Sequence, residues 1–155
     1  MTDQEMLVEI GAQEARLVFE DFGHDRALAL GQALLARGLA EGLPIAIDIS
    51  RNGHRLFHAA LEGSAPDNAE WIERKKRVVG RFGHSSLYIG CLLRSTGQTL
   101  EQKFCVSERE YAAHGGAFPI TLEGTGIIGT VAVSGLPQLE DHALVVEVLE
   151  RHLDL

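Results

Sequence analysis

The segment PIAIDISRNGHRLFHAAL, residues 44–61, constrains the fold more than any other part of the chain. Asn52-Gly53 is the favoured pair for a two-residue type I′ turn, in which both residues have positive φ. Apolar and polar residues alternate on either side of this pair, as in two strands that each bury one face. The segment therefore predicts an antiparallel β-hairpin.

Centring the turn on Asn52-Gly53 sets the expected register of this hairpin. The cross-strand pairs are then Ser50 with Arg55, Ile49 with Leu56, Asp48 with Phe57, Ile47 with His58, and Ile45 with Ala60. The isoleucine face is the core face, with His58 at its far end. On the other face, Arg55 lies diagonal to Asp48.

Hydrophobic periodicity and turn residues predict the remaining elements. Helices are expected over residues 3–18, 25–41, 66–83, 85–95 and 137–153, and strands over 98–106, 118–122 and 127–133, with 16–22 as an alternative short edge strand. Glu123–Gly126 is the expected turn of a second hairpin. Consecutive strands joined by tight turns form an antiparallel sheet. Helices on both sides of that sheet make an α/β (α+β) three-layer α/β/α sandwich.

Composition excludes several classes of protein. A chain of 155 residues is one domain's worth, so residues 1–155 are expected to form a single domain. The net charge of −8 argues against a nucleic-acid partner, which requires an excess of Lys and Arg on one face. The N-terminus lacks the features of a signal peptide, and no apolar run approaches the ~20 residues of a membrane span. Cys91 and Cys105 are too isolated for a disulfide framework or a zinc site, which favours a cytoplasmic protein with two reduced thiols.

The helix predicted over 66–83 combines a charged face with one misplaced lysine. Asp67 or Asn68 is its expected N-cap, and i,i+4 ion pairs are expected between Glu70 and Arg74 and between Glu73 and Arg77. The apolar seam of the helix runs through Trp71, Lys75, Val78 and Phe82. The Lys75 ammonium therefore either extends to the edge of the seam or points into a cleft, ready to meet a carboxylate.

The last helix repeats this spacing in His142, Val146, Leu149 and Leu153, with Asp141 beside the histidine. In one interpretation, Asp141 only interacts favourably with the positive end of the helix dipole in the first turn. In the other, both residues face a cleft, where His142 can donate a hydrogen bond or ligate a metal. Neighbouring residues on a helix point about 100° apart. This angle argues against Asp141 and His142 as an acid–base dyad, although not against two separate cleft residues.

Two glycine-containing segments meet at one edge of the predicted sheet. His114-Gly115-Gly116 precedes one strand of the second hairpin and Ser134-Gly135 ends the other. Backbone N–H groups of successive glycines bind anions, or the glycines serve only turns with positive φ. The match of 124–129 to the dinucleotide motif G-x-G-x-x-G is discounted, because a strand-like run follows it where the motif requires a helix. The pair His54 and His58 is also discounted as a zinc site, because such residues on a strand lie about 13 Å apart.

Four blocks together resemble a known family: DRALALGQALL, DNAEWIERKKRVVGRFGHSS, YAAHGGAFPI and GTVAVSGLPQLEDH. They are similar, in order and over nearly the whole chain, to the haem-degrading-domain (GlcG/HbpS-like) proteins. The similarity is greatest to the branch with W-I-x-R-K and S-G-L-P-x-x-D-H blocks. The resemblance implies a profilin-like fold with a five-stranded antiparallel sheet, a homo-oligomer of at least two chains, and haem as a candidate ligand.

The same blocks supply the candidate ligand-binding residues. These are Asn68, Trp71, Lys75, Ser85, Ser86, His114, Gly115, Gly116, Ser134, Gly135, Asp141 and His142. Lys75 and the glycine amides are expected to hold carboxylates, which in haem are the propionates. His114 and His142 are the candidate haem-iron ligands.

Three functions remain open on the sequence. The first is a protein that binds a small molecule, either haem or another carboxylate-bearing ligand. The second is a small-molecule enzyme that uses Lys75 and His142 in a cleft. The third is an oligomeric interaction module without a ligand.

Overall fold

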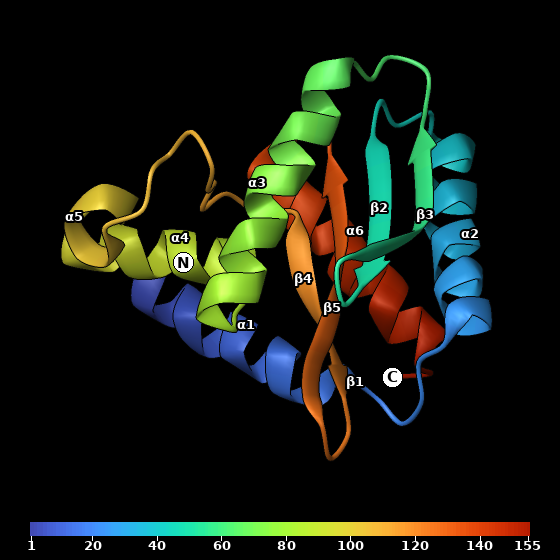
Figure 1. Cartoon of the computed structure of the whole chain (residues 1–155), viewed down its shortest axis with the longest axis horizontal. Helices are drawn as coiled ribbons and strands as arrows, with labels where there is room; N and C mark the ends of the chain where they lie inside the picture. Colours follow the sequence, from blue (N-terminus) through green and yellow to red (C-terminus); the bar gives the residue numbers. More distant parts are fainter.

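A five-stranded sheet forms the middle layer of the fold, as seen in the computed structural model, which describes all of residues 1–155 (Figure 1). The strand order is β1-β4-β5-β2-β3. The strands are β1 Val18–Phe19, β2 Ala46–Arg51, β3 His54–Ala60, β4 Ala117–Leu122 and β5 Gly126–Ser134. The helices are α1 Asp3–Arg16, α2 His24–Glu41, α3 Pro66–Phe82, α4 Ser86–Thr96, α5 Leu100–Phe104 and α6 Gln138–His152.

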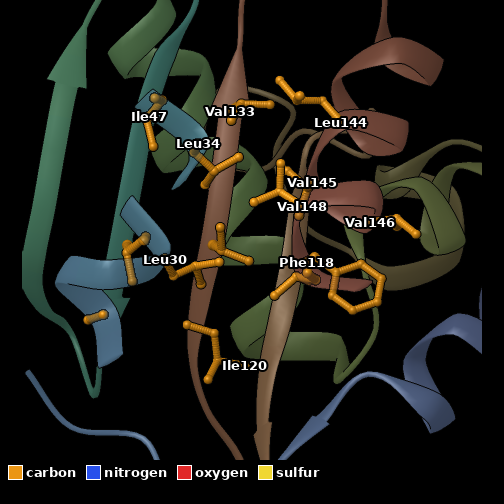
Figure 2. Packing of buried hydrophobic residues seen from close by; sticks show 14 of the residues in the cluster. Leu30, Leu34, Ile47, Phe118, Ile120, Val133, Leu144, Val145, Val146 and Val148 are labelled. Atoms are coloured by element: carbon orange, nitrogen blue, oxygen red, sulfur yellow. The ribbon is translucent and has the colours of Figure 1, made fainter. Parts of the chain in front are cut away.

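One face of the sheet carries large apolar side chains and packs against α2 and α6. Figure 2 shows this core, in which Leu30 and Leu34 of α2 and Val145 and Val148 of α6 meet Ile47, Phe118, Ile120 and Val133 of the sheet. The predicted isoleucine face of the first hairpin is part of it, because Ile45, Ile47 and Ile49 are fully buried there. Removal of this apolar area from water is the main source of stability.

The opposite face of the sheet, under α3, has small and polar side chains. Ala46, Ala117 and Ala132 pack against Ile72 and Val79 of α3. Asp48, Ser50, Thr130 and Ser134 are also buried on these strands. Small side chains let α3 approach the sheet closely, and they leave room for cavities at both ends of the helix.

The sheet is mixed rather than purely antiparallel, which corrects the prediction. The short edge strand expected within 16–22 is present as β1, and it runs parallel to β4. The two hairpins are antiparallel as predicted, with β4 and β5 joined by a turn after Leu122. The direction of β1 depends on how α1 brings the chain to the sheet edge, and a two-residue strand carries no pattern that specifies it.

The first hairpin has the predicted turn but not the predicted register. Asn52 and Gly53 both have positive φ, and Ser50 pairs with Arg55. A β-bulge beyond Ser50 then shifts the pairing by one residue, so the four other expected pairs are wrong. The observed pairs include Ile49 with Phe57 and Asp48 with His58. His58 consequently lies on the Asp48 face, with its Nδ1 4.0 Å from Asp48 Oδ2, rather than at the end of the core face.

Two local predictions for the helices are also wrong. The N-cap of α3 is Ala65, and Asn68 reaches back from the first turn to accept a hydrogen bond from the Ala65 N–H at 2.8 Å. Within residues 98–106, where a strand was predicted, Leu100–Phe104 form the short helix α5. Thr99 and Gln102 build a capping box that begins this helix.

Arg74 and Arg77 of α3 bind the loop between α5 and β4 instead of forming the expected i,i+4 pairs. Arg74 donates to the carbonyl oxygen of Glu108, and Arg77 donates to that of Glu110. Glu73 instead pairs with Arg55 and Lys76. These contacts fix the chain between α5 and β4, which carries His114, against α3.

None of the helices has the length and apolar character of a membrane-spanning segment. Cys91 is buried and Cys105 is exposed, and both thiols are free, as predicted.

Candidate functional site

A cavity of about 300 Å³ lies between the N-terminal half of α3, the end of β5 and the start of α6. We call it the Lys75 cavity. Its lining residues are Asn68, Trp71, Lys75, His114, Ser134, Gly135, Leu136, Gln138 and Asp141. Seven of these nine were predicted from the sequence as ligand-binding residues, so the segments expected at one edge of the sheet do meet there.

Lys75 brings a positive charge into the interior of the protein. Its side chain follows the apolar seam of α3, as predicted, but only 3% of the residue is exposed, so the ammonium does not extend to solvent. The ammonium Nζ donates to the carbonyl oxygen of Val133 at 3.3 Å and to Asp141 Oδ2 at 3.4 Å. Both hydrogen bonds are long. An ammonium has three N–H donors, so one donor remains for the cavity.

Asp141 is the carboxylate that faces Lys75. Only 1% of the residue is exposed, and its Oδ1 accepts a hydrogen bond from the Leu136 N–H at 3.1 Å. Its position in the first turn of α6 also favours a negative charge. Asp141 therefore holds both the β5–α6 turn and the ammonium of Lys75.

Burial shifts the pKa values of Lys75 and Asp141 in the directions that favour their neutral forms. Desolvation lowers the pKa of Lys75, although the charge of Asp141 opposes this change. Desolvation raises the pKa of Asp141 to about 6, against the opposing effects of Lys75 and of backbone hydrogen bonds. Both shifts have the same physical cause, because a charged group loses its hydration inside the protein. The proton between Lys75 and Asp141 is therefore less firmly held by the amine than it would be in water.

Neutral polar groups line the wall beside this pair. Asn68 donates from Nδ2 to Ser134 Oγ at 3.2 Å, which joins the start of α3 to the end of β5. Gln138 Oε1 accepts a hydrogen bond from the Gly115 N–H at 3.0 Å. These side chains are donors and acceptors that can orient a bound polar molecule.

His114 and Trp71 form the outer rim of the cavity. Their rings meet edge to face with centroids 5.6 Å apart, and the guanidinium of Arg74 lies 4.3 Å from the centre of the Trp71 ring. Desolvation lowers the pKa of His114, and the positive charges of Lys75, Arg74 and Arg94 lower it further. The rim therefore favours a neutral imidazole until an anion enters.

Gly116 makes room for the ammonium, although it does not line the cavity. A Cβ at this position would lie 2.7 Å from Lys75 Nζ, and the φ of 139° is in the region that favours glycine. Gly115 packs under α6, with its N–H bound to Gln138. The amide of Gly115 is therefore already satisfied by the protein, so it does not form the anion site considered for the two glycines.

Ser85 and Ser86 lie outside the Lys75 cavity. Ser85 is the N-cap of α4 and accepts a hydrogen bond from the Tyr88 N–H. The hydroxyl of Ser86 bonds to the backbone of Ala117 in β4, both as a donor and as an acceptor. The Ser85 hydroxyl therefore caps α4, and the Ser86 hydroxyl joins α4 to β4.

His142 is also not in the cavity, which corrects the expectation that it shares a cleft with Lys75. Only 5% of the residue is exposed, and its Nε2 lies 2.8 Å from Gln13 Oε1 of α1. Burial lowers the pKa of His142 to about 4, so the imidazole is neutral at pH 7. The predicted divergence of neighbouring helix residues is confirmed, because Asp141 faces Lys75 while His142 faces α1.

Sequence reasoning missed Leu136 and Gln138 as lining residues. Both lie inside the block from Ser134 to His142 that was singled out, but neither is charged or nucleophilic. The contact of Gln138 with the Gly115 N–H joins two segments 23 residues apart. No local spacing indicates that contact.

A larger cavity of about 640 Å³ lies at the other end of α3, and it contains none of the predicted site residues. Its charged residues include Lys76 and Glu73, which pair with each other, and Lys76 also binds Asp48. We place the candidate site in the smaller cavity because only there does an ammonium with a spare donor face the cavity. No group of three or more His, Cys, Asp or Glu side chains is arranged to hold a metal ion.

Comparisons with known proteins identify a family and a shared fold. A family model described as "Haem degrading protein HbpS-like" matches residues 22–150. A UPF0303 protein of Streptomyces avermitilis is 54% identical over 145 residues, which cover 94% of this chain and 89% of that protein. The crystal structure of the Ybr137w protein has a TM-score of 0.89 and 39% identity, covering 96% of this chain and 87% of that one. The structure of a PduOC:haem complex has a TM-score of 0.69 at 14% identity, covering 84% of this chain and 94% of that one, which shows a shared fold alone.

Proposed function

The chain belongs to the HbpS-like family of haem degrading proteins, and on that premise we propose that it binds a small carboxylate-bearing molecule in the Lys75 cavity. The observation that carries the proposal is the buried ammonium of Lys75, which lines the cavity and has one N–H donor left over. A carboxylate that enters gains a charge-assisted hydrogen bond in a site of low dielectric. Asn68, Ser134 and Gln138 supply neutral partners for its remaining polar atoms.

Haem itself does not fit the residues of this cavity. The volume of about 300 Å³ is at the lower end of small-molecule sites, and only Trp71 and Leu136 give it apolar walls. A porphyrin is a broad apolar plate that requires extensive apolar contact. Of the two candidate iron ligands, His142 is buried against Gln13 and only His114 reaches the rim. A group the size of a single propionate matches the cavity, whereas the macrocycle does not.

Calorimetry with small monocarboxylates tests the proposal. We expect the wild type to bind acetate and lactate, and not the neutral acetamide and lactamide. Lys75→Met is expected to weaken lactate binding by about 10–100-fold, because a hydrogen bond to a charged group is lost. Lys76→Met is the matched control and should leave the affinity unchanged. Equal affinity for lactate and lactamide would contradict the proposal. A Soret band that saturates at one equivalent of haemin would contradict the exclusion of haem.

We further propose that the protein is a homo-oligomer of at least two chains. Two features support this assembly. β3 is a seven-residue edge strand, and such edges are normally paired or covered. α1 buries only Ile10 and leaves Val8 76% exposed.

Light scattering at micromolar concentration measures the assembly directly. We expect a mass of at least twice the 16.9 kDa of one chain, and a smaller assembly after deletion of residues 2–15. A mass near 16.9 kDa for the full chain would contradict the assembly. A truncated chain that stays fully oligomeric would exclude α1 from the interface.

A further inference from the structure

We propose that Lys75 forms a Schiff base with the carbonyl carbon of a small oxo acid bound in the Lys75 cavity. The inference rests on the proposed function, because it assigns a substrate class to the same cavity. In the proposed function Lys75 acts only as a positively charged hydrogen-bond donor, whereas here its amine is also a nucleophile.

Among the amines of the chain, Lys75 is placed for this chemistry by its surroundings. Its Nζ lines a cavity and has only long hydrogen bonds, to Val133 and Asp141. Lys76 is bound by Asp48, Glu73 and the Ser50 hydroxyl. Lys103 is on the surface, with its ammonium over the Phe104 ring. Lys75 thus combines access to a cavity with a weakly held proton.

Asp141 is the group that can take this proton. Its Oδ2 lies 3.4 Å from Lys75 Nζ, and transfer of one proton converts a buried ion pair into a neutral amine and a neutral acid. Burial favours the neutral forms of both groups, as the lowered pKa of Lys75 and the raised pKa of Asp141 indicate. The amine lone pair is then free to react.

The reaction balances within the pair and the substrate. The amine of Lys75 attacks the carbonyl carbon, a C–N bond forms, and the carbonyl oxygen takes up the proton that the amine nitrogen loses, which gives a neutral carbinolamine while Asp141 stays protonated. The C–O bond then breaks as Asp141 returns its proton, so the oxygen leaves as water. The products are a protonated imine on Lys75, a carboxylate on Asp141 and one water molecule. The net charge of the site is the same before and after.

The carboxylate of a bound oxo acid faces a positive charge on the Lys75 nitrogen both before and after the reaction. The imine nitrogen is positively charged, so it replaces the ammonium as the partner of the substrate carboxylate. Asn68, Ser134 and Gln138 lie in the same wall, where they can bond to the carbonyl oxygen or to the carboxylate. These features favour an oxo acid over a simple aldehyde.

Reductive trapping tests the inference on the intact protein. The full-length chain is incubated with pyruvate and sodium cyanoborohydride, which reduces an imine to a stable secondary amine. We expect the intact mass to increase by one reduced pyruvate, with the modification on the peptide that contains Lys75. Lactate, which has no carbonyl group at the second carbon, should bind without changing the mass. Lys76→Met is the matched control and should be modified as the wild type is.

Lys75→Arg separates binding from bond formation, because a guanidinium keeps the charge but forms no imine under these conditions. We expect this variant to stay unmodified by pyruvate while circular dichroism verifies its fold. Modification at Lys76, Lys103 or the amino terminus instead of Lys75 would overturn the inference. Binding of both pyruvate and lactate without any adduct would overturn the Schiff base and leave the proposed function intact. Failure of both acids to bind would overturn the two together.

Discussion

Lys75→Met is expected to destabilise the protein by about 3 kcal/mol at pH 8, because the substitution leaves Asp141 buried without its charge partner. In a chain of this length the loss corresponds to a decrease in melting temperature of roughly 6–12 °C. Methionine keeps most of the apolar stem of lysine, so the packing of the α3 seam changes little. The measurement is thermal or urea unfolding followed by circular dichroism.

The cost of this substitution should depend on pH in a definite direction. The folded-state pKa of Asp141 is raised to about 6, so this group favours the folded state below the ordinary aspartate pKa, and that contribution is lost as the pH rises through 6. Without the Lys75 ammonium, the folded-state pKa of Asp141 rises further. The free energy of unfolding of the variant therefore keeps decreasing above pH 6, so the difference in stability between the variant and the wild type grows between pH 6 and pH 8. At pH 5, where Asp141 is already largely protonated, the two proteins should be closer in stability.

The double variant Lys75→Met/Asp141→Asn is the decisive control. It has no carboxylate at position 141, so the additional loss of stability that Lys75→Met shows between pH 6 and pH 8 should disappear. We expect it to recover much of the stability that Lys75→Met loses at pH 8, with a coupling free energy of about 1–3 kcal/mol between the two sites. His142 titrates in all of these variants, so its contribution cancels from the comparison. Lys75 also lowers the pKa of His114, but it is absent from both the single and the double variant, so the contribution of His114 cancels when those two are compared. Additive effects at pH 8 would show that the two groups do not interact.

Elements that depend on nearby residues were predictable from the sequence. Asn52-Gly53 specifies its own turn, because both residues adopt positive φ at little cost. The i+3 and i+4 spacing on α3 was enough to place Lys75 on an apolar seam. The angle between neighbours on a helix separated Asp141 from His142. In each case the determining geometry spans only a few residues.

Features that depend on contacts between distant segments were not predictable in the same way. The bulge beyond Ser50 coincides with the ion pair between Arg55 and Asp48 and its links to Lys76 and Glu73 on α3. The partner of Lys75 lies 66 residues away, and no pattern in either helix identifies it. The position of His142 depends on Gln13, a residue of the N-terminal helix. Tertiary contacts of this kind decide which polar residues face a cavity.

The strand predicted over 98–106 was wrong for a local reason. Thr99 and Gln102 have the spacing of a capping box, a signal that helix α5 begins there. Here the signal was present in the sequence and outweighed the apparent strand character of the segment.

Gly115→Ala is expected to cost about 3 kcal/mol, a large effect for the addition of one methyl group. A Cβ at Gly115 would overlap the carbonyl oxygen of Gln138, and it would lie 3.0 Å from the Gln138 carbonyl carbon and 3.3 Å from His142 Cβ. The backbone of α6 cannot yield without moving its first turn, which carries Asp141. The segment with His114 must therefore shift away from α6, so lactate binding should weaken together with stability.

Gly80→Ala provides the matched control for this substitution. Gly80 lies inside α3, and a Cβ added there would meet no neighbouring atom within 4 Å. Alanine at this position should therefore raise stability by about 0.5–1 kcal/mol through helix propensity. Urea unfolding of the two variants then compares the same chemical change in a closed and an open site. If Gly115→Ala were as stable as the wild type and bound lactate equally well, the segment that carries His114 would not be held by α6. The link between the rim of the Lys75 cavity and its Asp141 wall would then be wrong.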